Sequence, residues 1–205
     1  MNTTSAMQTC SHTTGLTFLG IGAQKAGTTW LAKWLSMHPE VHMPVKEIHF
    51  WDHPPFSPAR LIRYKNRFES STKKAHGEIT PKYAILPLDT IKLIHDNFPK
   101  LRIIYILRNP IERAWSQVRM EYARRMYKDN ASPSDMSTDW FIEHMLSEES
   151  ISRGSYTNCI RNWLTYFSRD QLRIFIYEKD LAMPRKMLAE CCQHLEINDS
   201  FYNSV

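Results

Sequence analysis

The sequence lacks the features that mark several large classes of protein. Its 205 residues include four cysteines: Cys10, Cys159, Cys191 and Cys192. Their spacing is not that of a zinc site, and the adjacent last two are poorly placed to form a disulfide with each other. No run approaches the ~20 apolar residues that a membrane-spanning helix needs. The Ser/Thr-rich start, Met1 to Gly15, has no signal-peptide pattern. We therefore expect reduced thiols, no metal, no membrane span and a cytoplasmic location.

A strong charge imbalance is also absent. Lys and Arg number 26 against 21 Asp and Glu, which gives a formal net charge of +5 without a dense basic block. This mild excess suits small anionic ligands and does not predict a nucleic-acid partner. With 42% hydrophobic residues the chain can bury a substantial core. We expect a flexible lead-in over residues 1–15 and one α/β domain over residues 16–205.

Glycine is scarce, and its placement is therefore informative. Three of the six glycines lie between Gly20 and Trp30. An apolar stretch from Leu16 to Ile21 predicts a buried strand before them, and Thr28–Met37 predicts a helix after them. Glycine allows the backbone conformations that point several N–H groups at an anion, and the helix adds its positive N-terminal end. The pattern predicts a phosphate-binding loop.

This loop departs from the nucleoside triphosphate pattern at one position. Gly22 and Gly27 have the required spacing, but Thr28 stands where the lysine of Gly-x4-Gly-Lys-Ser/Thr is expected. The loop's cation is Lys25, three positions earlier. A donor with fewer negative charges than a triphosphate needs less neutralisation, so we expect no metal ion.

The loop resembles a known family. It is similar to the 5′-phosphosulfate loop of sulfotransferases that use 3′-phosphoadenosine 5′-phosphosulfate (PAPS). The resemblance implies that this loop binds the donor, through the following residues: Gln24, Lys25, Ala26, Gly27, Thr28, Thr29 and Trp30.

A second motif supports the resemblance. The stretch Leu101–Leu107 predicts a buried strand, and Arg108 stands at its carboxyl end, where ligands of parallel sheets collect. In sulfotransferases the pattern Leu-Arg-Asn-Pro-x-x-Arg-x-x-Ser supplies an Arg and a Ser to the 3′-phosphate, here Arg108 and Ser116. An Arg-Gly-x-Tyr run further along implies that Tyr156 approaches the cofactor.

A third motif lies between Val41 and Asp52. Glu47 and His49 are two residues apart, so in an extended segment both would point into one cleft. The run Pro-x-Lys-Glu-x-His-Phe-Trp resembles the segment of carbohydrate-type sulfotransferases whose Glu is the proposed catalytic base. We expect Glu47 to be the base and Lys25 to stabilise the leaving phosphate, with His49 as the competing base. Val45, Ile48 and Phe50 form an apolar frame that could desolvate Glu47.

One family position does not match. Heparan-sulfate sulfotransferases carry a functional lysine in a Glu-Lys-Thr-Pro-x-Tyr run, and Ile79 occupies that position here. Lys82 cannot simply be substituted for it, because a shift of three residues changes the direction of the side chain. The family's C-terminal basic loop over the adenosine phosphate is also not visible before Val205. The chain is therefore either short or uses another element for that task.

The resemblance covers Leu16 to Ile197 and implies a P-loop-like three-layer α/β/α domain with a mostly parallel sheet. The implied reaction moves a sulfuryl group from PAPS to a hydroxyl or amine of a glycan, glycolipid or small metabolite, leaving 3′-phosphoadenosine 5′-phosphate (PAP). Two alternatives stay open: a non-catalytic nucleotide-binding module, and a phosphate-loop kinase. The kinase would need Mg²⁺ and a lysine at the position of Thr28.

Hydrophobic periodicity places the remaining helices. Residues 130–135 are predicted to form a turn-rich loop. The predicted helices are Leu88–Asn97, Ile111–Lys128, Thr138–Glu149, Asn158–Phe167 and Pro184–Leu195, and a further strand is predicted at Leu172–Tyr177.

Overall fold

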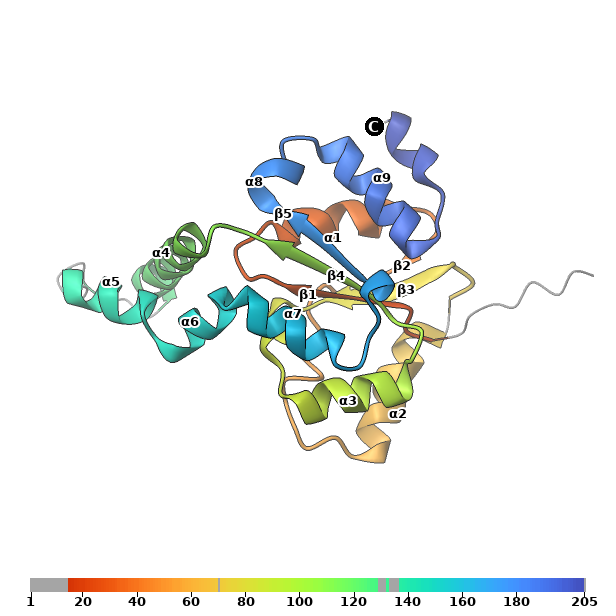
Figure 1. Cartoon of the computed structure of the whole chain (residues 1–205), viewed down its shortest axis with the longest axis horizontal. Helices are drawn as coiled ribbons and strands as arrows, with labels where there is room; N and C mark the ends of the chain where they lie inside the picture. The colour runs from red at the N-terminus through yellow and green to blue at the C-terminus, as the bar shows by residue number, and fades with distance from the viewer. Residues whose placement is uncertain (1–14, 70, 129–131, 133–136, 205) are drawn as a thin grey trace, which may run out of the picture.

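A parallel sheet forms the centre of the molecule (Figure 1). The computed structural model describes residues 15–69, 71–128, 132 and 137–204. The sheet order is β2-β3-β1-β4-β5, and the four pairings between neighbouring strands are all parallel. The strands are β1 (Phe18–Gly22), β2 (Val41–His42), β3 (Ala75–Ile79), β4 (Arg102–Leu107) and β5 (Leu172–Ile176). The predicted fold class is therefore confirmed.

Helices cover both faces of the sheet. In Figure 1, α1 and α9 lie on one face and α3 and α7 on the other, while α4, α5 and α6 extend away to one side. The α-helices are α1 (Thr28–Met37), α2 (Pro58–Glu69), α3 (Leu88–Asn97), α4 (Pro110–Lys128), α5 (Thr138–Met145), α6 (Glu148–Gly154), α7 (Tyr156–Leu164), α8 (Tyr177–Asp180) and α9 (Pro184–Leu195). The 3₁₀ helices are η1 (Pro81–Ile85), η3 (Arg169–Gln171) and η4 (Asp199–Ser204).

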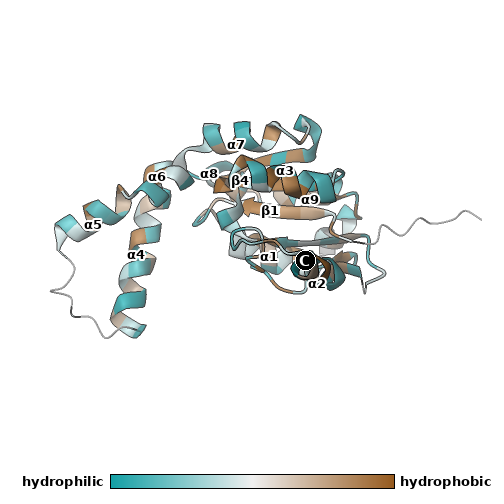
Figure 2. Ribbon diagram, turned by 90° about the horizontal axis from the view of Figure 1, so that it is seen from below, coloured by the Kyte–Doolittle hydropathy of each residue, from teal (hydrophilic) through white to brown (hydrophobic). Residues whose placement is uncertain are grey.

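The core lies between these layers. All five residues of β1 are buried, as are Ile103 to Ile106 of β4, because helices cover both faces of these strands. Figure 2 shows β1 in brown between more hydrophilic helices. Trp163 of α7 is fully buried, and its indole N–H donates to the Tyr83 carbonyl at 3.2 Å. Each fully buried large apolar side chain contributes roughly 1.5 to 3 kcal/mol, so this core fixes the strand ends that carry the site.

Most predicted helices are confirmed, and one is wrong. The predictions match α1, α3 and α9 at both ends. The single helix predicted over Thr138–Glu149 is instead two helices, because Ser147 begins a new one. Its Oγ accepts from the Ser150 N–H at 3.3 Å and donates to the His144 carbonyl at 3.0 Å. The loop predicted at 130–135 lies outside the described residues, apart from residue 132.

The described residues bear on two of the predictions, that of reduced thiols and that of no membrane span. Cys159, Cys191 and Cys192 are free and buried, as expected, while Cys10 lies outside the described residues. No helix among the described residues is both long enough and apolar enough to cross a membrane.

His194, on α9, makes the stability of the fold depend on pH. Its Nε2 lies 3.1 Å from the Ile103 carbonyl, and burial next to Arg102 lowers the pKa of His194 from 6.5 to about 4. The unfolded chain therefore takes up a proton between pH 6.5 and about 4 that the folded chain does not bind. We expect the free energy of unfolding to fall as pH decreases through this window.

Urea unfolding of the wild type and of His194→Gln across this pH range checks this expectation. The Gln variant should show a shallower decrease below pH 6.5 than the wild type. Parallel curves for the two proteins would contradict the assignment to His194.

Candidate active site

A cavity of about 620 Å³ opens where β1, β3 and β4 end. Its lining combines the predicted phosphate loop, the start of α4 and the segment between β2 and α2. From the loop and the start of α1 it is lined by Gln24, Lys25, Gly27, Thr28, Thr29 and Trp30. Ala26 is fully buried and does not line it.

The loop backbone is arranged to accept an anion. Lys25 and Gly27 both have left-handed conformations, with φ of 68° and 83°. A Cβ at position 27 would lie 3.3 Å from atoms of both Leu181 and Tyr177, so this position favours glycine for space as well as conformation. No side chain caps the start of α1, and its first turn has no acidic residue. The N–H groups of that turn are therefore available to an anion.

The cavity is strongly positive around Lys25. Burial lowers the pKa of the Lys25 amine below its ordinary value. Three neighbouring cations lower this pKa further: Arg108, Arg119 and Lys46. Such crowding of like charges costs free energy in the empty protein and is relieved when an anion binds among them.

Arg108 links the end of β4 to the phosphate loop. One of its guanidinium N–H groups donates to the Lys25 carbonyl at 2.8 Å, and the guanidinium lies 4.7 Å from the ring centre of Tyr177. The Arg108 Nε is buried and has no hydrogen-bond partner in the described part of the chain. Ser116, one turn into α4, lines the same cavity. The predicted pair thus lies together at the cavity.

Tyr156 has a different place from the one predicted. It does not line the cavity. Its hydroxyl donates to the Arg108 carbonyl at 2.7 Å and lies 3.4 Å from the Arg108 N–H. Tyr156 therefore holds the backbone of Arg108 from outside the cavity. Any effect of Tyr156 on a ligand would be exerted through that arginine.

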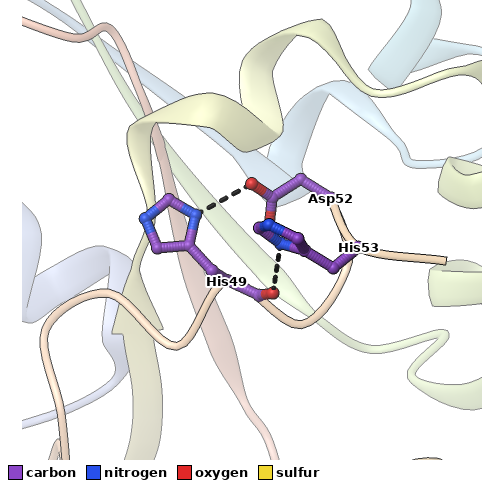
Figure 3. A group of neighbouring side chains, drawn as sticks. All are labelled: His49, Asp52 and His53. Atoms are coloured by element: carbon purple, nitrogen blue, oxygen red, sulfur yellow. Dashed lines mark hydrogen bonds and ion pairs between the residues drawn. The ribbon is translucent and has the colours of Figure 1, made fainter.

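Glu47 and His49 both line the cavity and contact each other. His49 Nε2 lies 3.3 Å from Glu47 Oε2, and Lys46 pairs with the other oxygen of Glu47. The Asp52 side chain is only 3% exposed, and its Oδ2 lies 2.8 Å from His49 Nδ1 (Figure 3). Asp52 therefore orients the imidazole so that Nε2 faces Glu47. Asp52 was missed as a site residue, although it stands three positions after His49.

The predicted reason for this arrangement was wrong in part. Glu47 and His49 share a side, but the segment is not a continuous strand, because His49 has φ of 54°. The apolar frame is also incomplete, since Val45 is 46% exposed while Phe50 is buried. The left-handed turn at His49 is what brings its ring back to Glu47.

One group of residues in the described part of the chain could hold a metal ion: His49, Asp52 and His53, whose ligand atoms lie within 4.8 Å of one another. Hydrogen bonds already engage the Nδ1 atom of both imidazoles. His49 Nδ1 faces Asp52, and His53 Nδ1 lies 2.9 Å from the His49 carbonyl (Figure 3).

Lys82 was not among the predicted site residues. It lines the cavity, and its Nζ lies 4.0 Å from a Glu149 oxygen that also accepts from Arg153 at 2.6 Å. The sequence comparison did not place Lys82 at the position of Ile79, because a shift of three residues changes the direction of a side chain. The strand ends at Ile79, and the chain then turns into η1, so strand spacing no longer sets the direction of the side chain. Arg153 lines the cavity as well and was also missed.

Comparison with known proteins gives a consistent result. A sequence model described as the sulfotransferase domain matches residues 17–203. The bifunctional heparan sulfate N-deacetylase/N-sulfotransferase 1 of Caenorhabditis briggsae is 26% identical over 207 residues, covering 92% of this chain. The chain spans 23% of that relative's length.

Solved structures share the fold. A sulfotransferase from Alicyclobacillus acidocaldarius superposes with a TM-score of 0.70 at 24% identity, covering 90% of this chain and 82% of that one. The mouse sulfotransferase SULT7A1, solved in complex with PAP, gives a TM-score of 0.59 at 21% identity, covering 92% and 62%.

Proposed function

The chain belongs to the sulfotransferase domain family, and from this membership we propose that it transfers a sulfuryl group from PAPS to a hydroxyl or amine of an acceptor. The relative from C. briggsae is named for heparan sulfate, which favours a glycan-containing acceptor over other small metabolites. PAP in the SULT7A1 complex supports PAPS as the donor.

One observation carries this proposal. A single cavity is lined by a phosphate loop with Lys25, by Arg108 with Ser116, and by Glu47. The first two groups suit the two phosphate positions of PAPS, and the third suits removal of an acceptor proton. The guanidinium of Arg108, whose side chain lines the cavity, fits an additional phosphate, which a simple 5′-nucleotide would not supply.

In the proposed reaction the acceptor oxygen or nitrogen attacks the sulfur in line with the leaving phosphate. The new bond joins sulfur to the acceptor, and the bond between sulfur and the bridging phosphate oxygen breaks. The acceptor proton passes to Glu47, while Lys25 and the loop N–H groups stabilise the charge that develops on PAP. Holding both reactants in one cavity supplies the orientation that the reaction needs.

His49 has a supporting role in this mechanism. Asp52 holds Nδ1, so Nε2 lies beside Glu47 and contacts the carboxylate that receives the proton. The His49 side chain is 39% exposed, which allows that proton to pass on to solvent.

We predict that PAP binds in the presence of EDTA, at least about tenfold more tightly than AMP. The 3′-phosphate gains charge-assisted hydrogen bonds from Arg108, and one such bond contributes roughly 1.5 to 3 kcal/mol. Isothermal titration calorimetry checks both nucleotides. Arg108→Gln should remove the preference, whereas Arg161→Gln, an exposed arginine outside the cavity, should keep it. Equal affinities for PAP and AMP in the wild type would contradict the proposed donor.

Turnover measurements distinguish the proposed sulfotransferase from two other candidate functions. A non-catalytic module would bind PAP equally well but would not convert PAPS to PAP with any acceptor. A kinase would instead consume ATP with Mg²⁺, and Thr28 at the usual lysine position argues against it. Incubating the chain with each donor, with and without Mg²⁺, and measuring product nucleotide by chromatography distinguishes the three.

A further inference from the structure

A carboxylate lies sealed inside the protein next to the proposed base. Glu78, on β3, is fully buried, and burial raises its pKa. Among the described residues it has four hydrogen-bond donors, and all four are uncharged. They are Tyr64 OH at 2.8 Å and Tyr83 OH at 3.0 Å on Oε1, and Ile48 N–H at 2.8 Å and Thr80 OH at 2.6 Å on Oε2. A buried carboxylate is a costly way to stabilise a core, so its geometry points to another role.

These bonds fasten the segment that carries Glu47. The Ile48 N–H, next to Glu47, donates directly to Glu78. On the other side of Glu47, the Lys46 carbonyl accepts from the Ile79 N–H at 2.8 Å, immediately after Glu78 in the chain. The backbone is thus held against β3 on both sides of the proposed base.

Tyr83 extends the same attachment past His49. Its hydroxyl accepts from the Phe50 N–H at 2.9 Å and lies 3.4 Å from the Trp51 nitrogen, while its own proton goes to Glu78. Three backbone N–H groups of residues 48–51 therefore depend on one buried carboxylate, one directly and two through Tyr83. The turn that returns the His49 ring to Glu47 lies between them.

We propose that Glu78 and Tyr83 are positioning residues, which set the place of Glu47 and His49 in the active site from inside the core. This inference rests on the proposed function for its effect on rate. The attachment itself is a property of the fold and can be measured without any activity.

Tyr64 provides a matched control. Its hydroxyl bonds the same oxygen of Glu78 at nearly the same distance as that of Tyr83, but it bonds no backbone N–H of residues 46–52 in the described structure. Its ring stacks on Phe50 with centres 4.4 Å apart, and phenylalanine keeps that ring. Tyr64→Phe and Tyr83→Phe therefore each remove one hydroxyl from Glu78, but only the second also removes the acceptor of the Phe50 and Trp51 N–H groups.

The test compares amide hydrogen exchange and steady-state kinetics in these variants. We expect Tyr83→Phe to speed exchange in residues 48–53 at least about tenfold and to lower kcat about 10-fold to 100-fold, because small displacements of a reacting group are costly. PAP affinity should change less than about twofold. Tyr64→Phe should leave both exchange in this segment and kcat within about twofold of the wild type. Glu78→Gln should act like Tyr83→Phe, since its amide NH₂ must face hydroxyl or N–H donors.

The outcomes separate this inference from the proposed function. Equal effects of Tyr64→Phe and Tyr83→Phe on exchange and kcat would show a general packing role and overturn the inference. So would unchanged exchange in residues 48–53 of Tyr83→Phe. A wild type that transfers no sulfuryl group would overturn the proposed function, while the exchange comparison would still decide whether Glu78 and Tyr83 hold the segment.

Discussion

Lys25→Ala should lower turnover of PAPS by about 10² to 10³-fold while weakening PAP binding much less. Charge develops on the leaving phosphate only as the bond to sulfur breaks, so a cation placed there acts mainly on the transition state. Lys25 lies at the crown of the phosphate loop and lines the cavity with Arg108. Steady-state kinetics give kcat, and calorimetry gives the affinity for PAP.

Lys33→Ala is the matched control, because Lys33 is an exposed lysine of α1 outside the cavity. It should behave like the wild type in both measurements. Near-normal kcat in Lys25→Ala would remove this residue from the mechanism. A loss of PAP affinity as large as the loss of kcat would assign Lys25 to ground-state binding instead.

The second large effect concerns the base. Glu47→Gln keeps the shape of the side chain and removes its basicity, so we expect kcat to fall by roughly 10² to 10⁴-fold with PAP affinity intact. His49→Asn should retain measurable activity, because His49 contacts Glu47 and reaches solvent without being required to take the proton first. The pH profile of kcat should also change between the wild type and His49→Asn if the imidazole assists Glu47.

The opposite pattern would reverse these roles. If Glu47→Gln turns over normally and His49→Asn is inactive, His49 is the base and Glu47 only orients it. Asp52→Asn helps to separate the two cases. If His49 is the base, Asp52→Asn should lower kcat as much as His49→Asn does, because the imidazole is no longer oriented. If Glu47 is the base, Asp52→Asn should lower kcat less than Glu47→Gln does.

The sequence alone was sufficient for the fold and for the prediction that the phosphate loop and Arg108 lie at one cavity. A glycine loop between an apolar strand and a helix is a local pattern, and α1 begins and ends at the predicted residues. Arg108 could be placed because β4 is an uninterrupted apolar run whose end is easily recognised. Parallel strands bring their carboxyl ends to one edge, so two local motifs were enough to predict that Lys25 and Arg108 would meet.

The part of the cavity around Glu47 and Lys82 was harder to predict because it depends on backbone turns that no periodic pattern marks. Lys82 lines the cavity only because η1 replaces the strand after Ile79. His49 faces Glu47 through a left-handed backbone conformation, which histidine adopts less readily than glycine. No periodic pattern in the sequence predicts such a conformation. Asp52 contacts His49 only because of the turn between them, and Glu78 acts through tertiary hydrogen bonds. A buried carboxylate cannot be told from an exposed one by residue type.

The most direct test of the central claim is mass spectrometry of candidate acceptors after incubation with PAPS carrying labelled sulfur, in EDTA. The account predicts that the label appears on a hydroxyl- or amine-bearing acceptor, with one PAP formed for each labelled product, and that both fall together in Lys25→Ala and Glu47→Gln. Across a screen of glycans, glycolipids and small metabolites, PAPS left unchanged, or PAP formed equally by the wild type and both variants, would contradict it.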